Sequence, residues 1–111
     1  MSVTAKPLVT AAYAANSQTT VYTAPTATRT IIDKCTGYNG TAGAVTLGIN
    51  IVPLSGSASA ANLIMSKSIA AGEAYTFPEV VGHVLEAGGF VSVVAGAANS
   101  IVFRMSGREV S

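Results

Sequence analysis

Histidine and cysteine are the side chains best suited to acid–base or nucleophilic chemistry near neutral pH, and this 111-residue chain has one of each, His83 and Cys35. Cys35 stands in an apolar, β-branched stretch, where a single cysteine is typically a small buried hydrophobe. It cannot form an internal disulfide. A zinc site needs three or four ligands, which one histidine and one distant cysteine do not supply. The pair therefore predicts neither a nucleophile nor a metal site.

The carboxylates do not complete a catalytic set either. Asp33 is the sole aspartate and lies beside Lys34, which favours a solvated or strand-paired charge. Glu79 and Glu86 flank His83, and in a helix Glu79 and His83 would form an i,i+4 pair that stabilises by a few tenths of a kcal/mol. We expect His83 to be an exposed polar residue on a short connection, with a proton-linked interface role as the alternative. No catalytic residue, cofactor-binding residue or metal ligand is predicted, and no enzyme.

Glycine and tyrosine offer two further kinds of site. The stretch "GYNGTAG" at 37–43 lacks the GxxxxGK[ST] pattern of a phosphate-binding loop. The tyrosines could stack on sugars, although in a β protein they are more often strand and interface residues. They are Tyr13, Tyr22, Tyr38 and Tyr75.

The elements that carry these residues are predicted to be strands. In "AVTLGINIVPL", residues 44–54, the apolar residues alternate with Thr46, Gly48 and Asn50, as in a half-buried strand. Pro53 has no amide hydrogen and should end it. Further strands are expected over 18–25, 28–38, 62–69, 73–77, 89–96 and 100–107. Short strands at this spacing, separated by Gly- and Asn-rich turns, predict an all-β, antiparallel sandwich or barrel. The "NG" at 39–40 indicates a hairpin.

Two segments depart from this alternation. Over 79–86 the apolar residues are four apart, which favours a short helical turn; a strand is the alternative and would direct His83 to the core. Residues 1–17 show no strong alternation. We expect an N-terminal arm, with one strand around 7–12, that is ordered against a neighbouring molecule. The β-sandwich domain is then 18–111.

The composition favours an interface protein. Half of the residues are hydrophobic, 10% are charged, and the mean hydropathy is +0.50, so we expect apolar areas outside the core and a homo-oligomer. The basic residues are scattered, which disfavours nucleic-acid binding. Neither a signal peptide nor a membrane span is predicted, and no membrane partner is expected.

Several motifs resemble small virion proteins of tailed bacteriophages. The resemblance covers about residues 18–96 and rests on the order and spacing of the motifs. They are "T-x-Y-T-x-P" at 20–25, "T-I-I" at 30–32, "V-P" at 52–53 before a Ser/Gly/Ala loop, "I-A-A-G-E" at 69–73 and "G-x-V-L-E-A-G" at 82–88.

This resemblance implies a jelly-roll-like sandwich and a capsid cement, or decoration, protein. Such a protein would bind the major capsid (coat) protein on the virion surface after assembly in the host cytoplasm. It also implies self-association, with a trimer slightly favoured over a dimer. The alternative is a tail, fibre or appendage module, one that could bind carbohydrate.

Overall fold

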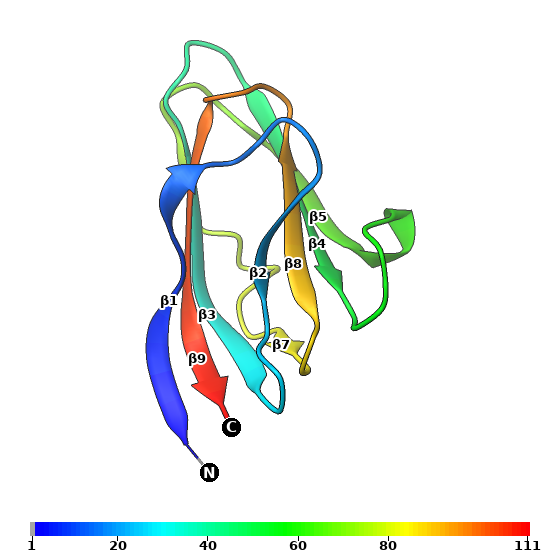
Figure 1. Ribbon diagram of the computed structural model, residues 1–111. Helices are drawn as coiled ribbons and strands as arrows, with labels where there is room; N and C mark the ends of the chain where they lie inside the picture. The colour runs from blue at the N-terminus through cyan, green and yellow to red at the C-terminus, as the bar shows by residue number, and fades with distance from the viewer. Residues whose placement is uncertain (1) are drawn as a thin grey trace.

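Nine β-strands form two antiparallel sheets that pack face to face in a computed structural model, which describes residues 2–111 (Figure 1). Sheet A consists of β1 (Val3–Tyr13), β9 (Ile101–Val110), β3 (Arg29–Asn39) and β6 (Ala74–Tyr75) in that order, with β7 (Val84–Leu85) also paired to β3. Sheet B consists of β2 (Thr19–Thr23), β8 (Phe90–Ala95), β4 (Val45–Val52) and β5 (Leu63–Ile69) in that order. A single 3₁₀ turn, η1 (Ala60–Asn62), precedes β5.

The order of the strands is that of a jelly roll. The chain crosses from one sheet to the other after β1, β2 and β3, forms the β4–β5 hairpin, and then crosses again after β5, β7 and β8. Together β6 and β7 occupy one strand position beside β3. Eight positions in two four-stranded layers define the double-sheet fold. The predicted antiparallel sandwich is confirmed.

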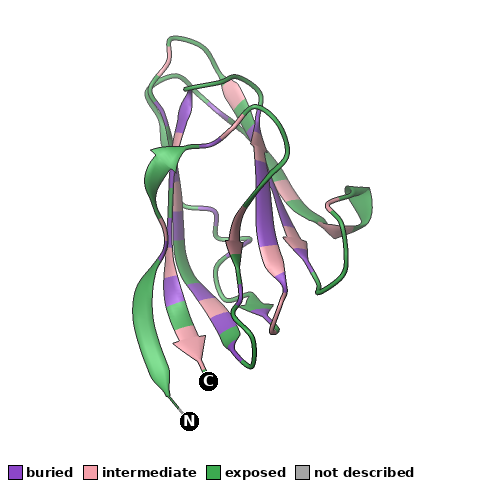
Figure 2. Ribbon diagram, in the orientation of Figure 1, coloured by how far each residue is buried: buried purple, intermediate pink, exposed green. Residues whose placement is uncertain are grey.

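Alternating residues build the core between the sheets. Leu47 and Ile49 of β4 are fully buried, as the pattern of residues 44–54 predicted. From sheet A, Phe103 and Met105 of β9 project into the same core. Figure 2 shows this alternation as purple bands along the central strands. Within residues 2–111, no helix is long and apolar enough to cross a membrane.

The prediction of a free N-terminal arm is wrong for residues 3–13, which form β1, the edge strand of sheet A, paired along its length with β9. The predicted strand around 7–12 is part of it. The side chains of β1 do not alternate between core and solvent: Leu8 alone is buried, and the rest of the strand is largely exposed (Figure 2). Its attachment comes from backbone hydrogen bonds, which leave no signature in the hydrophobic pattern. Two register shifts interrupt the pairing, on either side of Val9.

Residues 79–86 do not form the predicted helical turn. Instead, two successive turns are closed by the Val80 N–H donating to Phe77 O and the His83 N–H donating to Val80 O, and β7 follows. The register of β7 against β3 is fixed by Gly82, which donates to Ile32 O at 2.7 Å. With φ at +92°, Gly82 adopts a conformation that L-residues rarely reach.

The predicted hairpin at "NG" is also wrong, because β3 and β4 lie in different sheets. Asn39 is buried at the end of β3, and its side-chain amide donates to the carbonyls of Gly43 and Ile69, both at 2.8 Å. The asparagine therefore holds a crossover between the sheets in place of a tight turn within one sheet.

Candidate functional site

The two side chains best suited to catalysis, Cys35 and His83, are not brought together, because the first is buried and the second is exposed. Cys35 is fully buried in β3, and this burial raises the pKa of its thiol from 9.0 to about 12. A thiol of this kind is protonated at neutral pH and is no nucleophile. Among the described residues, no three His, Cys, Asp or Glu side chains lie close enough together to hold a metal ion.

His83 lies on an exposed connection, as predicted, but its expected partner is engaged elsewhere. The Tyr75 hydroxyl donates to both oxygens of Glu79, at 2.9 and 3.0 Å. The Arg29 guanidinium donates to Glu86 at 3.0 Å. Both carboxylates that flank His83 in the sequence therefore interact with side chains of other strands. Glu79 accepts hydrogen bonds from Tyr75 of β6, and Glu86 forms an ion pair with Arg29 of β3.

Asp33 is strand-paired. Arg108 of the neighbouring β9 donates through Nε and Nη2 to its carboxylate, with distances of 2.9 to 3.3 Å. Both side chains are more than two-fifths exposed. A surface ion pair of this kind contributes at most about 1 kcal/mol to the free energy of unfolding. Asp33 is therefore a paired surface residue, as the sequence favoured.

Replacing His83 with alanine is expected to change the free energy of unfolding by less than about 0.5 kcal/mol, because an exposed side chain away from a core or network contributes little. Its backbone carbonyl, which accepts from the Ile32 N–H at 3.0 Å, is retained in the variant. Urea unfolding at pH 7 measures the change. A loss of several kcal/mol would assign His83 a role that its exposure does not explain.

The two sheets are joined at one end by a polar contact. The Tyr22 hydroxyl of β2 lies 2.5 Å from Glu109 of β9 and 2.8 Å from Thr30 of β3. Partial burial, and then the hydrogen bond to Glu109, raise the pKa of Tyr22 from 10.0 to about 12. Lys6 of β1 lies 3.5 Å from the same carboxylate. Tyr22 therefore forms part of the contact between the two sheets, and its ring is not available to stack on a ligand.

Stability is expected to fall as the pH rises from about 9 to about 12. Both Cys35 and Tyr22 have a folded-state pKa above the ordinary value, so the unfolded chain releases its protons first and is favoured. Cys35 alone accounts for about 1.4 kcal/mol between pH 8 and pH 10. Urea unfolding across this range measures the slope. In Cys35→Ala the slope below pH 10 should largely disappear; an unchanged slope would show that another group causes it.

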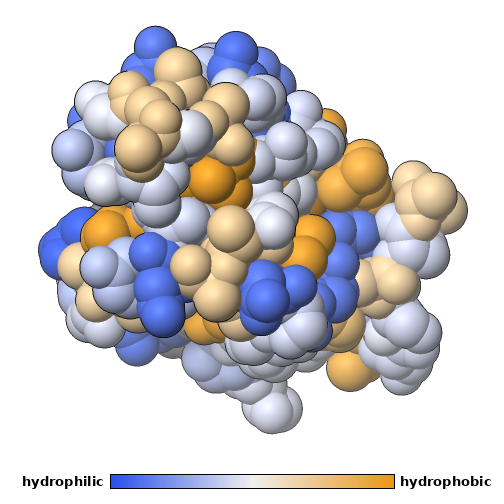
Figure 3. Space-filling model, turned by 90° about the horizontal axis from the view of Figure 1, so that it is seen from above, coloured by the Kyte–Doolittle hydropathy of each residue, from blue (hydrophilic) through white to orange (hydrophobic). Residues whose placement is uncertain are grey.

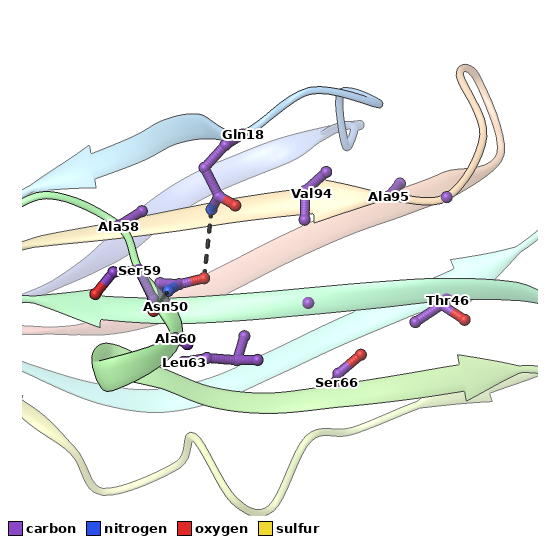
Figure 4. Close-up of a pocket in the computed structure, with 12 residues that line it drawn as sticks. Gln18, Thr46, Asn50, Ala58, Ser59, Ala60, Leu63, Ser66, Val94 and Ala95 are labelled. Carbon is purple, nitrogen blue, oxygen red and sulfur yellow. Dashed lines mark hydrogen bonds between the residues drawn. The ribbon is translucent and has the colours of Figure 1, made fainter.

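A groove runs over the outer face of sheet B. Its floor is Gly48 in β4, and it holds about 490 Å³, a volume typical of binding pockets. Val94 of β8 and Leu63 at the start of β5 lie on the two strands that flank β4 (Figure 4). We call this site the Gly48 groove.

The walls of the Gly48 groove are held by side-chain amides. On one side Gln18, just before β2, donates to Ser92 at 2.8 Å. It also donates to Asn50 at 3.4 Å, the hydrogen bond drawn in Figure 4. On the other side the buried Asn50 amide donates to Ser59 O at 2.9 Å and to Asn62 Oδ1 at 2.7 Å. These hydrogen bonds hold the loop before β5 against the sheet.

Charge is absent from this site and concentrated on the opposite sheet. The four strands of sheet B contain one charged residue, Lys67, and its ammonium group lies 4.9 Å from the centre of the Tyr75 ring. The strands of sheet A contain seven, which are Lys6, Arg29, Asp33, Lys34, Arg104, Arg108 and Glu109. A charged ligand in the Gly48 groove would lose water without gaining a counter-charge.

The sequence reasoning missed the Gly48 groove. The alternation in the sequence correctly placed Thr46, Gly48 and Asn50 on the outer face of a strand. That face was expected to be exposed to water, with no groove on it. The available signal was the glycine itself, because glycine inside a strand often marks close approach of a ligand or another backbone. None of the four tyrosines lines the groove. At the end of the molecule seen in Figure 3, hydrophobic and hydrophilic residues are interspersed.

Comparison of the chain with known protein families, with curated proteins and with solved structures finds no match.

Proposed function

We propose that this chain is a structural protein of a tailed-bacteriophage particle, a capsid cement protein that binds coat subunits and stabilises the head. The observation that carries the proposal is the separation of charge between the sheets. A neutral, rigid outer face on sheet B suits docking against another protein surface, because no charged group must be stripped of water.

Two further features support a cement protein. The motifs from "T-x-Y-T-x-P" at 20–25 to "G-x-V-L-E-A-G" at 82–88 resemble those of small phage virion proteins, and the jelly-roll order agrees with the fold that this resemblance implies. A shell multiplies a modest contact over many copies, so an interface of ordinary size is sufficient. The proposed location is the capsid surface, and the proposed partners are the coat protein and further copies of this chain, with a trimer slightly favoured over a dimer.

The experiment is fractionation of purified phage particles into heads and tails, followed by mass spectrometry of each fraction. The expected result is that the protein stays with the heads, and that heads lacking it burst at lower temperature. Recovery with the tails, or binding of purified protein to host glycans, would replace this proposal with an appendage module. Absence from both fractions would contradict a structural virion role altogether.

A further inference from the structure

The basic side chains, which are scattered in the sequence, gather on sheet A. Five of the six lie on its strands, and three of these five are paired with carboxylates, as Lys6–Glu109, Arg29–Glu86 and Arg108–Asp33. The other two, Lys34 and Arg104, form no ion pair with any residue from 2 to 111. Sheet A therefore carries two cations without a counter-charge.

These two cations project from the same face of the sheet. Lys34 of β3 and Arg104 of β9 are both exposed, and the residues next to them toward the core are buried. Arg104 lies opposite Thr36, and Lys34 lies opposite Ser106, so the two cations are diagonal neighbours on adjacent strands, about 7 Å apart. The outer face of sheet A thus has a compact positive centre.

Two tyrosines lie beside this centre on the same face. Tyr13 of β1 and Tyr38 of β3 are both opposite Val102 of β9, in a row across three adjacent strands (Figure 1). Their Cα atoms are about 10 Å apart, and the two side chains are 59% and 44% exposed. Arg104 follows Val102 by two residues along β9, which places its guanidinium group next to the row.

The fold does not use the polar groups of these two tyrosines. The hydroxyls of Tyr22 and Tyr75 donate to glutamates, whereas those of Tyr13 and Tyr38 make no hydrogen bond in the described part of the chain. The Tyr38 ring lies against Gly40, where an added methyl group would come within 3.3 Å of its Cε2 atom. One side of this ring is therefore seated on the backbone, and two phenols and two cations without partners share one face.

We infer that this face, defined by Tyr13, Tyr38, Val102, Arg104 and Lys34, binds an acidic segment of another protein. Carboxylates of the segment would pair with Arg104 and Lys34, and an apolar side chain would lie on Val102 between the two rings. Tyrosine and arginine are the residue types that contribute most to protein interfaces, and a guanidinium group binds a carboxylate in a bidentate manner. The inference goes beyond the proposed function, which assigns the coat contact to the opposite sheet.

A second copy of this chain does not fit as the occupant. A two-fold contact through this face would bring like charges together. Nor does another part of the chain offer a free carboxylate, because all five acidic side chains accept a hydrogen bond or form an ion pair within their own chain, namely Asp33, Glu73, Glu79, Glu86 and Glu109. Nucleic acid is disfavoured as well, since its affinity depends on the number of phosphates neutralised, and only two cations are unpaired.

Selection from a displayed library of random peptides, on the full chain tethered through an added C-terminal tag, tests the inference. The expected result is enrichment of peptides that combine Asp or Glu with an apolar residue. The double variant Lys34→Gln/Arg104→Gln should bind an enriched peptide at least about tenfold more weakly than the wild type. Wild-type affinity should also fall with added salt, which screens exposed charges. Tyr13→Ser and Tyr38→Ser should each weaken binding and leave this salt dependence in place.

The matched control is Arg29→Gln/Lys67→Gln, which removes the same net charge at positions outside the face. This control should bind the enriched peptide as the wild type does, and circular dichroism should show both double variants folded, because the replaced side chains are exposed. Failure to enrich any peptide, enrichment of peptides without acidic residues, or equal binding by Lys34→Gln/Arg104→Gln and the wild type would overturn the inference.

Two further results separate this inference from its neighbours. Binding of single-stranded oligothymidylate that Lys34→Gln/Arg104→Gln abolishes, without enrichment of acidic peptides, would replace the acidic segment with nucleic acid. The head fractionation decides the coat-binding role independently: protein on the heads that selects no acidic peptide would overturn this inference alone, and protein on the tails that does select acidic peptides would overturn the proposed function alone.

Discussion

Deletion of residues 2–13 is expected to prevent cooperative folding near room temperature. The deletion removes β1, whose backbone pairs with β9, and Leu8, which packs into the core. Each backbone hydrogen bond contributes about 1 kcal/mol net, and burial of a leucine about 2 kcal/mol. Their sum approaches the 5–15 kcal/mol that stabilises a typical domain.

Circular dichroism during urea unfolding measures the effect of the deletion. Lys6→Ala is the matched control, because it removes an exposed ion pair of β1 and keeps its backbone; it should cost less than about 1 kcal/mol. A truncated chain that unfolds at the wild-type midpoint would show that these residues are a separable arm after all.

Gly107→Ala is expected to destabilise the protein by about 3 kcal/mol. Gly107 lies in β9 between β1 and β3, opposite Lys6 and Ile32. A methyl group there would lie 2.2 Å from the Ile31 carbonyl oxygen and 2.9 Å from Leu8 Cδ1. Because the first of these is a backbone atom of an internal strand, the sheet itself would have to move.

The denaturation midpoint of Gly107→Ala should be compared with that of Gly48→Ala, which makes the same change in another strand. Gly48→Ala has room for the methyl group and should be neutral or slightly stabilising. Equal midpoints for the two variants would contradict the close approach of β9 and β3 at residue 107.

The strands that could be predicted from the sequence are those that bury one face. In β4 every second residue enters the core, so its alternation is visible in the sequence. In β1 only Leu8 is buried, and an edge strand that is held by its backbone shows no such pattern. The prediction of a hairpin at "NG" was wrong because the local sequence does not reveal long-range contacts. The Asn39 side chain donates to the carbonyls of Gly43, in the following loop, and of Ile69, in β5.

Of the candidate site, only the residues that form the floor of the groove could be placed from the sequence. Gly48 and Asn50 were assigned to the outer face of their strand, and that assignment is confirmed. The walls come from Gln18 and from the loop around Ser59, and no periodicity links segments so far apart.

The free edge of β1 has a consequence for the behaviour of the protein in concentrated solution. A strand of 11 residues at the rim of a sheet can template fibril growth. Pro7 has no N–H to offer an incoming strand, and the register shifts on both sides of Val9 break the straight ladder that cross-β stacking requires. Pairing with a further strand is therefore disfavoured along this rim, and this edge is protected against growth by strand addition.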